Sequence, residues 1–214
     1  GIGRMEPASR RSIVLASRSP RRLELALAEG WNVTVVVPEE SVESSQPPRG
    51  AGEPLEGYVI RLASAKARAV AEAGAHGVIV ACDTLGEVDG KALGKPADRE
   101  EARQMLQQLS GRRHRVLTGT CVLRAPGGMP DFAVTESLLE MGALSEEFLA
   151  WYLDSGLWQG KAGACGLQDE RLPLSVVSGS ASNVVGLPLE TLREMLAAAD
   201  PRPATQSPGN LHRG

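Results

Sequence analysis

The alternation of short apolar runs with amphipathic stretches constrains the fold of this chain most strongly. Three runs rich in β-branched and apolar residues, "SIVLA", "VTVVV" and "GVIVA", have the composition of strands. Helix-like stretches at residues 20–29 and 54–73 separate them. Strands that alternate with helices are typical of α/β folds. The order of elements therefore predicts an α/β fold, and 214 residues are enough for one large or two small lobes.

The first predicted strand runs directly into a basic strand-to-helix turn. In "LASRSPRRLELAL", which starts at Leu15, Ser19 is a suitable N-cap and Pro20 suits the first helical position. The free backbone N–H groups of Arg21 and Arg22 would then open the helix. Such helix starts attract anions, especially phosphate. The alternative interpretation is a solvated basic face with no ligand.

An exposed loop and an amphipathic helix follow the second strand. The segment "PEESVESSQPPRGAGEP" is rich in proline, serine and glycine, which predicts an exposed loop. One face of the next helix is apolar except for a single lysine, and Gly74 suits the position after its end. The residues on that face are Leu55, Val59, Leu62, Lys66, Ala69 and Val70.

The second half of the chain predicts a hairpin, two long strands and three helices. The Asp-Gly pair in "VDGKAL" is typical of a tight hairpin turn. A capping pattern from Asp98 to Glu101 begins a helix that stops at Gly111. "PGG" joins strands at residues 114–124 and 132–141, a helix covers residues 145–153, and Pro188 begins the last helix.

Several charged residues lie near the ends of predicted elements. Asp83 follows "GVIVAC", and the carboxyl ends of strands are where open α/β sheets place ligand chemistry. We interpret Asp83 as a base or a metal ligand; the alternative is a cap of the following turn. Lys95 precedes a proline, which favours extended backbone. With Arg21, Arg22 and Lys66, it would line a positive pocket if these elements converge.

Two acidic residues at the end of the second strand are candidate metal ligands. Glu39 and Glu40, together with Asp83, offer the oxygen ligands that Mg²⁺ and Mn²⁺ prefer. The histidines compete less well, because His76 falls in a predicted loop and His114 stands beside arginines at a strand start. No Ser-His-Asp triad can be recognised in the sequence.

Charge, hydropathy and cysteine count exclude several classes of protein. The 26 acidic and 23 basic residues give a net charge of -3, which lacks the basic footprint of a nucleic-acid binder. No apolar run approaches the roughly 20 residues that cross a membrane, and the first residues lack a secretory core, so we expect a cytoplasmic protein. The three cysteines lack the spacing of zinc sites or disulfide frameworks and are predicted to be reduced thiols.

Six sequence blocks in a fixed order carry a resemblance to a known family. They are "LASRSPRRLEL", "YVIRLASAKA", "ACDTLGEVDGKALGKP", "EARQMLQQLSGRRHRVLTG", "GKAGACGLQ" and "SASNVVGLPLETL". The chain resembles the Maf (septum-formation protein) family of nucleoside triphosphate pyrophosphatases. The resemblance implies a Maf/ITPase-like α/β fold, a mixed twisted sheet flanked by helices with a cleft between two lobes. We expect this domain at residues 12–199, between a disordered leader (1–11) and a disordered tail (200–214).

The resemblance also implies an activity and its residues. Such proteins cleave a nucleoside triphosphate between the α- and β-phosphates, with a divalent cation such as Mg²⁺ or Mn²⁺. Asp83 would be the proton acceptor, and Glu39 or Glu40 would join it at the metal. The residues expected to contact the phosphates are Ser17, Arg21, Arg22, Lys66 and Lys95. A homodimer is implied by the resemblance alone.

Two further residues predict which base is accepted. Thr84 follows the aspartate and Gln168 ends the Lys-Ala-Gly loop, and in the resembling family this pair marks the dTTP/UTP branch. A glutamine amide can both accept from and donate to the edge of uracil or thymine. Cys165 stands where the family usually has an aromatic residue, and "TESLLEM" also departs from the usual pattern. The alternatives are a nucleotide-binding regulator of cell division that does not hydrolyse and a local nucleic-acid binder that uses the "GRRHR" run.

Overall fold

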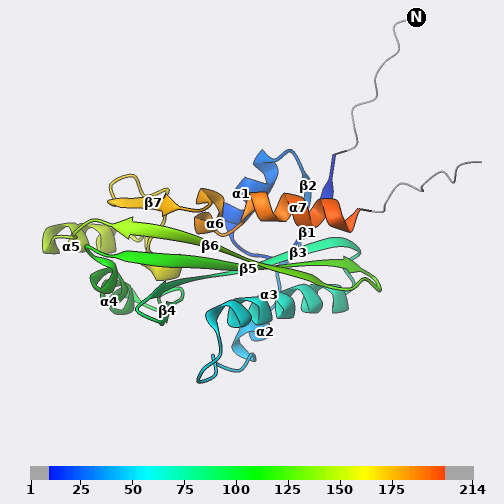
Figure 1. Ribbon diagram of the computed structural model, residues 1–214, viewed down its shortest axis with the longest axis horizontal. Coiled ribbons are helices and arrows are strands. Elements are labelled where there is room, and N and C mark those ends of the chain that lie inside the picture. Colours follow the sequence, from blue (N-terminus) through cyan, green and yellow to red (C-terminus); the bar gives the residue numbers. More distant parts are fainter. Residues whose placement is uncertain (1–9, 201–214) are drawn as a thin grey trace, which may run out of the picture.

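The computed structural model describes residues 10–200, and these form one mixed β-sheet with helices on both faces (Figure 1). Its strands are β1 (Ser12–Leu15), β2 (Asn32–Val35), β3 (Gly77–Val88), β4 (Lys91–Leu93), β5 (Arg113–Ala125), β6 (Asp131–Met141) and β7 (Leu174–Ser178). They run in the order β2-β1-β3-β5-β6-β7, with β4 paired to β3 outside this path. The pairs of β1 with β2 and β3 are parallel and the others are antiparallel. The predicted mixed α/β sheet is confirmed.

Each face of the sheet buries its own apolar core. The helices are α1 (Pro20–Ala28), α2 (Glu40–Ser44), α3 (Leu55–Glu72), α4 (Arg99–Leu109), α5 (Glu146–Ser155), α6 (Ala181–Val185) and α7 (Leu189–Ala199), with a 3₁₀ turn, η1, at Ala162–Ala164. One core lies between α3 and alternate residues of β3 such as Ile79, and the other lies between α1, α7 and residues such as Val80. This opposition follows from the two-residue period of a strand.

Gly119 of β5 lets α3 lie directly on the sheet. A Cβ atom at this position would come within 2.5 Å of the carbonyl carbon and oxygen of Val59 in α3. In the strand register Gly119 is the partner of Asp83. The close approach therefore sets the height of α3, and of Lys66 on it, above the centre of the sheet.

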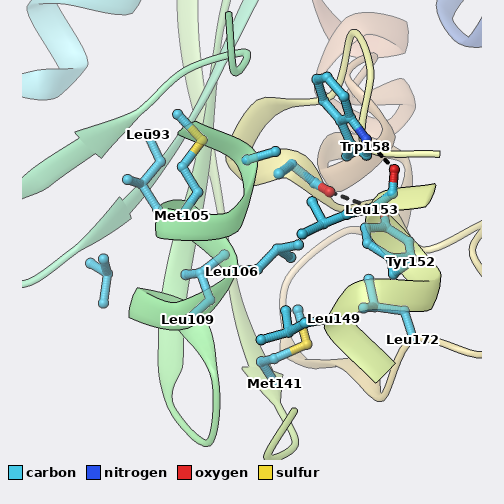
Figure 2. Close-up of a cluster of buried hydrophobic side chains, with 13 residues drawn as sticks. Leu93, Met105, Leu106, Leu109, Met141, Leu149, Tyr152, Leu153, Trp158 and Leu172 are labelled. Atoms are coloured by element: carbon cyan, nitrogen blue, oxygen red, sulfur yellow. Dashed lines mark hydrogen bonds between the residues drawn. The ribbon is translucent and has the colours of Figure 1, made fainter. Parts of the chain in front are cut away.

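A third core builds a second lobe at the far end of the long strands. Side chains of α4, α5 and β6 form this core together with Leu93 of β4 and Leu172, and Tyr152 of α5 is fully buried in it (Figure 2). The indole N–H of Trp158 donates to the carbonyl of Leu153 within this core. The lobe shares β3, β5 and β6 with the rest of the molecule, and a cleft lies between the two parts.

Local signals placed most elements correctly. Ser19 Oγ accepts from the backbone N–H of Arg22 at 3.4 Å, and Asp98 accepts from that of Glu101 at 2.8 Å, as the capping patterns predicted. The predicted apolar face of α3 is buried except at Ala69, which is partly exposed, and Lys66 on it is only 8% exposed. Within residues 10–200, no helix combines the length and apolar character that crossing a membrane requires.

Two expectations are wrong, and two elements were not predicted. The segment predicted as an exposed loop contains α2, and the sequence patterns did not predict strand β7 or helix α6. Asp83 does not follow a strand but lies inside β3, because β3 continues past its parallel pairing with β1 as the antiparallel partner of β5. Most of the predicted leader and tail lies outside the described residues; at their inner ends Arg11 forms an ion pair with Asp200.

Candidate active site

The cleft opens at a gap in strand pairing along one edge of β3. Strand β1 pairs with β3 as far as Val80, and β4 begins to pair with it at Gly86. Between these points, residues 81–85 have a strand partner on the β5 side alone among the described residues. Ser17 follows β1 at this gap, and its hydroxyl accepts from the N–H of Ser19 at 3.0 Å. Asp83 stands at the centre of the gap.

Lys66 fixes the carboxylate of Asp83. Its ammonium group donates to Asp83 Oδ1 at 3.1 Å and to the carbonyl of Cys82 at 3.1 Å. Cys82 is one of the residues 81–85 of β3 that border the gap. The other carboxylate oxygen, Oδ2, is buried and has no hydrogen-bond partner in the described part of the chain. A buried carboxylate oxygen without a partner is costly, so this atom is suited to a water molecule or cation.

Glu43 is the second carboxylate at this site, and the sequence patterns did not predict it. Its Oε1 lies 2.6 Å from Lys66 Nζ, so the same ammonium group contacts both Glu43 and Asp83. Burial opposes ionisation, but Lys66, Lys95 and Arg22 outweigh it and hold the pKa of Glu43 below its ordinary value. The one signal in the sequence was that Glu43 follows Glu40 by three residues. This spacing places the two side chains on one face only if the segment is a helix, as α2 is.

The two predicted acidic ligands lie beside the site rather than in contact with Asp83. Glu39 accepts from the hydroxyl of Ser41 at 3.4 Å, and Glu40 forms an exposed ion pair with Arg18 at 2.9 Å. Both line the same open cavity as Lys66. Within residues 10–200, no group of three or more His, Cys, Asp or Glu side chains forms a metal cage.

Arg22 is held rigidly over the gap. Arg22 is only 7% exposed. Its guanidinium donates to the carbonyl of Gly186 at 2.7 Å, to Thr84 Oγ1 at 3.2 Å and to Ser17 Oγ at 3.4 Å. Thr84 Oγ1 also lies 2.8 Å from Thr118 Oγ1. Ser17 before α1, Thr84 of β3 and Gly186 after α6 therefore all meet at the guanidinium of Arg22.

The site concentrates positive charge. Burial, then the neighbouring Arg22 and Lys66, lower the pKa of Lys95, and burial followed by Arg22 lowers the pKa of Arg21. Ser17, Arg22, Lys66 and Lys95 line an open cavity of about 490 Å³, within the usual range for ligand sites. Of the predicted phosphate residues, Arg21 lies further along the cleft, where it donates to the carbonyl of Gly160 at 2.8 Å.

The other end of the cleft lies against the second lobe. It is lined by Thr84, Lys95, the loop that contains Gln168, and a set of apolar side chains that includes Leu93 and Leu109. This part of the cleft continues the cluster of lysine and arginine side chains into a narrower space that has both polar and apolar side chains on its walls. Such an arrangement suits a ligand with a charged end and a flat end.

His114 lies in this narrower space, although its sequence context gave it no role. It is 4% exposed, and its Nδ1 has no hydrogen-bond partner within the described residues. Burial lowers the pKa of His114 to about 4, and the opposing effect of Glu87 is smaller. The ring is therefore neutral at physiological pH. In the sequence His114 competed less well as a site residue because it stands beside arginines at a strand start, but the alternation of β5 turns its side chain inward.

The predicted thiols agree with the structure. Cys82 and Cys121 are buried, Cys165 is partly buried in the cleft, and all three are free. Burial raises the pKa of Cys121 to about 11 and that of Cys165 to about 12. None of them is therefore present as a reactive thiolate near neutral pH.

Comparisons with known proteins identify relatives of this chain. The family described as Maf-like protein matches residues 12–199. A "dTTP/UTP pyrophosphatase" of Symbiobacterium thermophilum is 43% identical over 86% of this chain and 92% of its own length. One of Pyrococcus abyssi is 38% identical over 89% of this chain and 98% of its own. Among solved structures, a HAM1 protein from Coxiella burnetii is 17% identical, with a TM-score of 0.46 over 88% of this chain and 100% of that one.

Proposed function

The chain belongs to the Maf-like protein family, and we propose that it is an enzyme that hydrolyses dTTP and UTP to the monophosphate and pyrophosphate. The observation that carries the proposal is the position of Asp83. Asp83 lies at the open edge of β3, beside a cavity lined by lysine and arginine side chains. Lys66 holds one of its carboxylate oxygens, and the other has no partner in the described part of the chain. Relatives about 40% identical that bear this activity in their names support the choice of substrate.

A divalent cation, Mg²⁺ or Mn²⁺, fits the donor set. Asp83 Oδ2 lacks a partner in the described chain, and the carboxylate of Glu43 lies across the same lysine. Mg²⁺ is commonly held by one or two carboxylates together with substrate phosphates, so these two residues are sufficient as protein ligands. Glu39 and Glu40 are the alternatives at the rim of the cavity. When bound, the ion would neutralise phosphate charge and acidify a nearby water.

The residues of the chain have separable roles in this mechanism. Phosphoryl transfer depends on positioning and on charge stabilisation more than on covalent help. Ser17, Arg22, Lys66 and Lys95 hold the phosphates, and the hydrogen bonds that fix Arg22 mean that little reorganisation is needed when charge develops. Lys66 orients Asp83 through Oδ1, and Oδ2 has two acceptor sites, one that would hold the cation and one that orients the attacking water or accepts its proton.

Thr84 and Gln168 lie in the cleft at the end that would hold the base. Gln168 is exposed there, so its amide is available to uracil or thymine. The hydroxyl of Thr84 already contacts Arg22 and Thr118, which suggests that it acts on the base side by holding these neighbours in place. The pair would favour dTTP, UTP and 5-substituted uridine triphosphates.

A pyrophosphate-release assay tests the proposal directly. The purified chain should release pyrophosphate from dTTP and UTP in the presence of Mg²⁺ or Mn²⁺, faster than from 7-methyl-GTP or CTP. Asp83→Asn should leave the fold intact and lower turnover at least about 100-fold, since a positioned base contributes roughly 10²- to 10⁴-fold. Near-normal turnover in the folded variant would exclude Asp83 as the base.

The same assay separates the alternative, a nucleotide-binding regulator of cell division that does not hydrolyse. Binding of dTTP without pyrophosphate release would favour that alternative. A cytoplasmic location and a homodimer, with no nucleic-acid partner, stay predictions from the sequence.

A further inference from the structure

The loop that carries Gln168 is closed on itself by one buried carboxylate. Asp169, 7% exposed, receives the ammonium group of Lys161 on Oδ1 at 2.6 Å and the backbone N–H of Gly166 on Oδ2 at 3.2 Å. Lys161 and Asp169 stand at the two ends of the loop formed by residues 161–169. Their side chains are 11% and 4% exposed, so the ion pair is shielded from water and weakly screened.

Tyr152 anchors this closure to the core of the second lobe. The ring is fully buried among the side chains of α4 and α5 (Figure 2), and its hydroxyl lies 2.6 Å from Asp169 Oδ2 and 3.0 Å from the carbonyl of Ala164. Burial and then the bond to Asp169 raise the pKa of Tyr152, so the phenol keeps its proton and donates it. A neutral phenol that donates to a carboxylate forms a strong, charge-assisted hydrogen bond.

The backbone of the loop needs such an anchor. Ala164 has a φ of +63°, in the left-handed region that a residue with a Cβ rarely adopts. A Cβ on Gly166 would come within 2.7 Å of Gln168 Oε1 and 3.3 Å of Lys161 Cδ, so both side chains pack across this glycine. The side chain of Gln168 therefore lies over Gly166, as does that of the lysine that pairs with Asp169.

We infer that Asp169 is a positioning residue for base recognition: through Lys161, Tyr152 and Gly166 it holds the loop in the shape that presents Gln168 to the cleft. The inference rests on the proposed function, because it concerns the base of the substrate. Asp169 does not line the cleft itself, whereas Lys161, Gly166 and Gln168 do. Its effect is therefore transmitted through the loop and differs from that of a phosphate-binding residue.

The test compares Asp169→Asn with Glu170→Gln. Both substitutions remove one carboxylate charge from neighbouring positions, but Glu170 is exposed and makes no hydrogen bond or ion pair with the described residues. Asn at position 169 can still accept from Tyr152, but it leaves Lys161 without its counter-charge. A buried charge that loses its partner shifts a conformational equilibrium by roughly 5- to 150-fold, so a smaller fraction of the chain presents Gln168 to the cleft. Because apparent affinity falls with that fraction, we expect KM for dTTP and UTP to rise about 5-fold or more.

Inorganic tripolyphosphate provides the control that separates positioning from general damage. It has no base, so its inhibition constant should be the same in Asp169→Asn, Glu170→Gln and the unaltered chain. Partial unfolding would instead lower the active fraction, which reduces kcat for every substrate and leaves KM unchanged. Hydrogen exchange of the peptide that spans residues 160–169 should accelerate in Asp169→Asn and stay unchanged in Glu170→Gln.

The outcomes distinguish this inference from the proposed function. If the unaltered chain fails to hydrolyse dTTP, the proposed function is wrong, while the exchange rates still report whether Asp169 holds the loop. If the unaltered chain is active and Asp169→Asn has an unchanged KM, the inference is wrong and the function stands. Should Asp169→Asn fail to fold, Tyr152→Phe removes a single hydroxyl from the same network and should raise KM in the same direction.

Discussion

The buried, neutral His114 makes a quantitative prediction about acid stability. Its pKa is lowered from an ordinary 6.5 to about 4 in the folded chain, so the unfolded chain binds this proton more readily. Stability therefore falls as pH decreases from about 6.5 to about 4, and this contribution is absent above that window. Two and a half pKa units correspond to a loss of about 3 kcal/mol in the free energy of unfolding.

His114→Asn should remove this loss, because asparagine does not titrate. Urea denaturation from about pH 7.5 to about pH 4.5 gives the free energy of unfolding at each pH, and carboxylates contribute equally to both proteins. As the pH falls across this range, the free energy of unfolding of the variant should rise by about 2 to 3 kcal/mol relative to that of the unaltered chain.

His76→Asn serves as the matched control, because His76 is exposed in a loop and meets water in both states. Its pH dependence should parallel that of the unaltered chain. If His114→Asn also runs parallel, the imidazole binds its proton as readily in the folded protein as in the unfolded chain, and the argument that burial lowers the pKa of His114 is refuted.

Three further outcomes are expected. Gly119→Ala should destabilise the fold by about 1 to 3 kcal/mol in urea denaturation, because the new Cβ meets the backbone of Val59 at 2.5 Å and α3 must move; unchanged stability would contradict the close approach of α3. Gln168→Glu should lower kcat/KM for dTTP and UTP by roughly 5- to 150-fold, since a carboxylate cannot donate to the base; equal rates would remove Gln168 from base recognition. Chelation with EDTA should stop pyrophosphate release, and added Mg²⁺ should restore it; activity that persists in EDTA would refute the need for a cation.

The sequence by itself determined the features that depend on neighbouring residues. Ser19 and Pro20 specify where α1 begins, because a cap acts within one helical turn. The apolar face of α3 required Lys66 to be buried with it, since the helical period places the lysine there whatever the sheet does. The block "ACDTLGEVDGKALGKP", which resembles the Maf family, is enough to single out Asp83 as the candidate base.

Only the tertiary structure decided which distant residues meet. That Asp83 lies at an open edge of β3 depends on where β1 stops and β4 starts, two pairings set by different parts of the chain. Glu43 reaches Lys66 because α2 packs beside α3, and no pattern within α2 records that contact. Asp169 is buried because Tyr152 and Lys161 converge on it. In the sequence alone, Asp169 is a charged residue in a polar segment with no sign of burial. Periodicity reports which way a side chain faces, whereas its partner across the fold depends on how the elements pack.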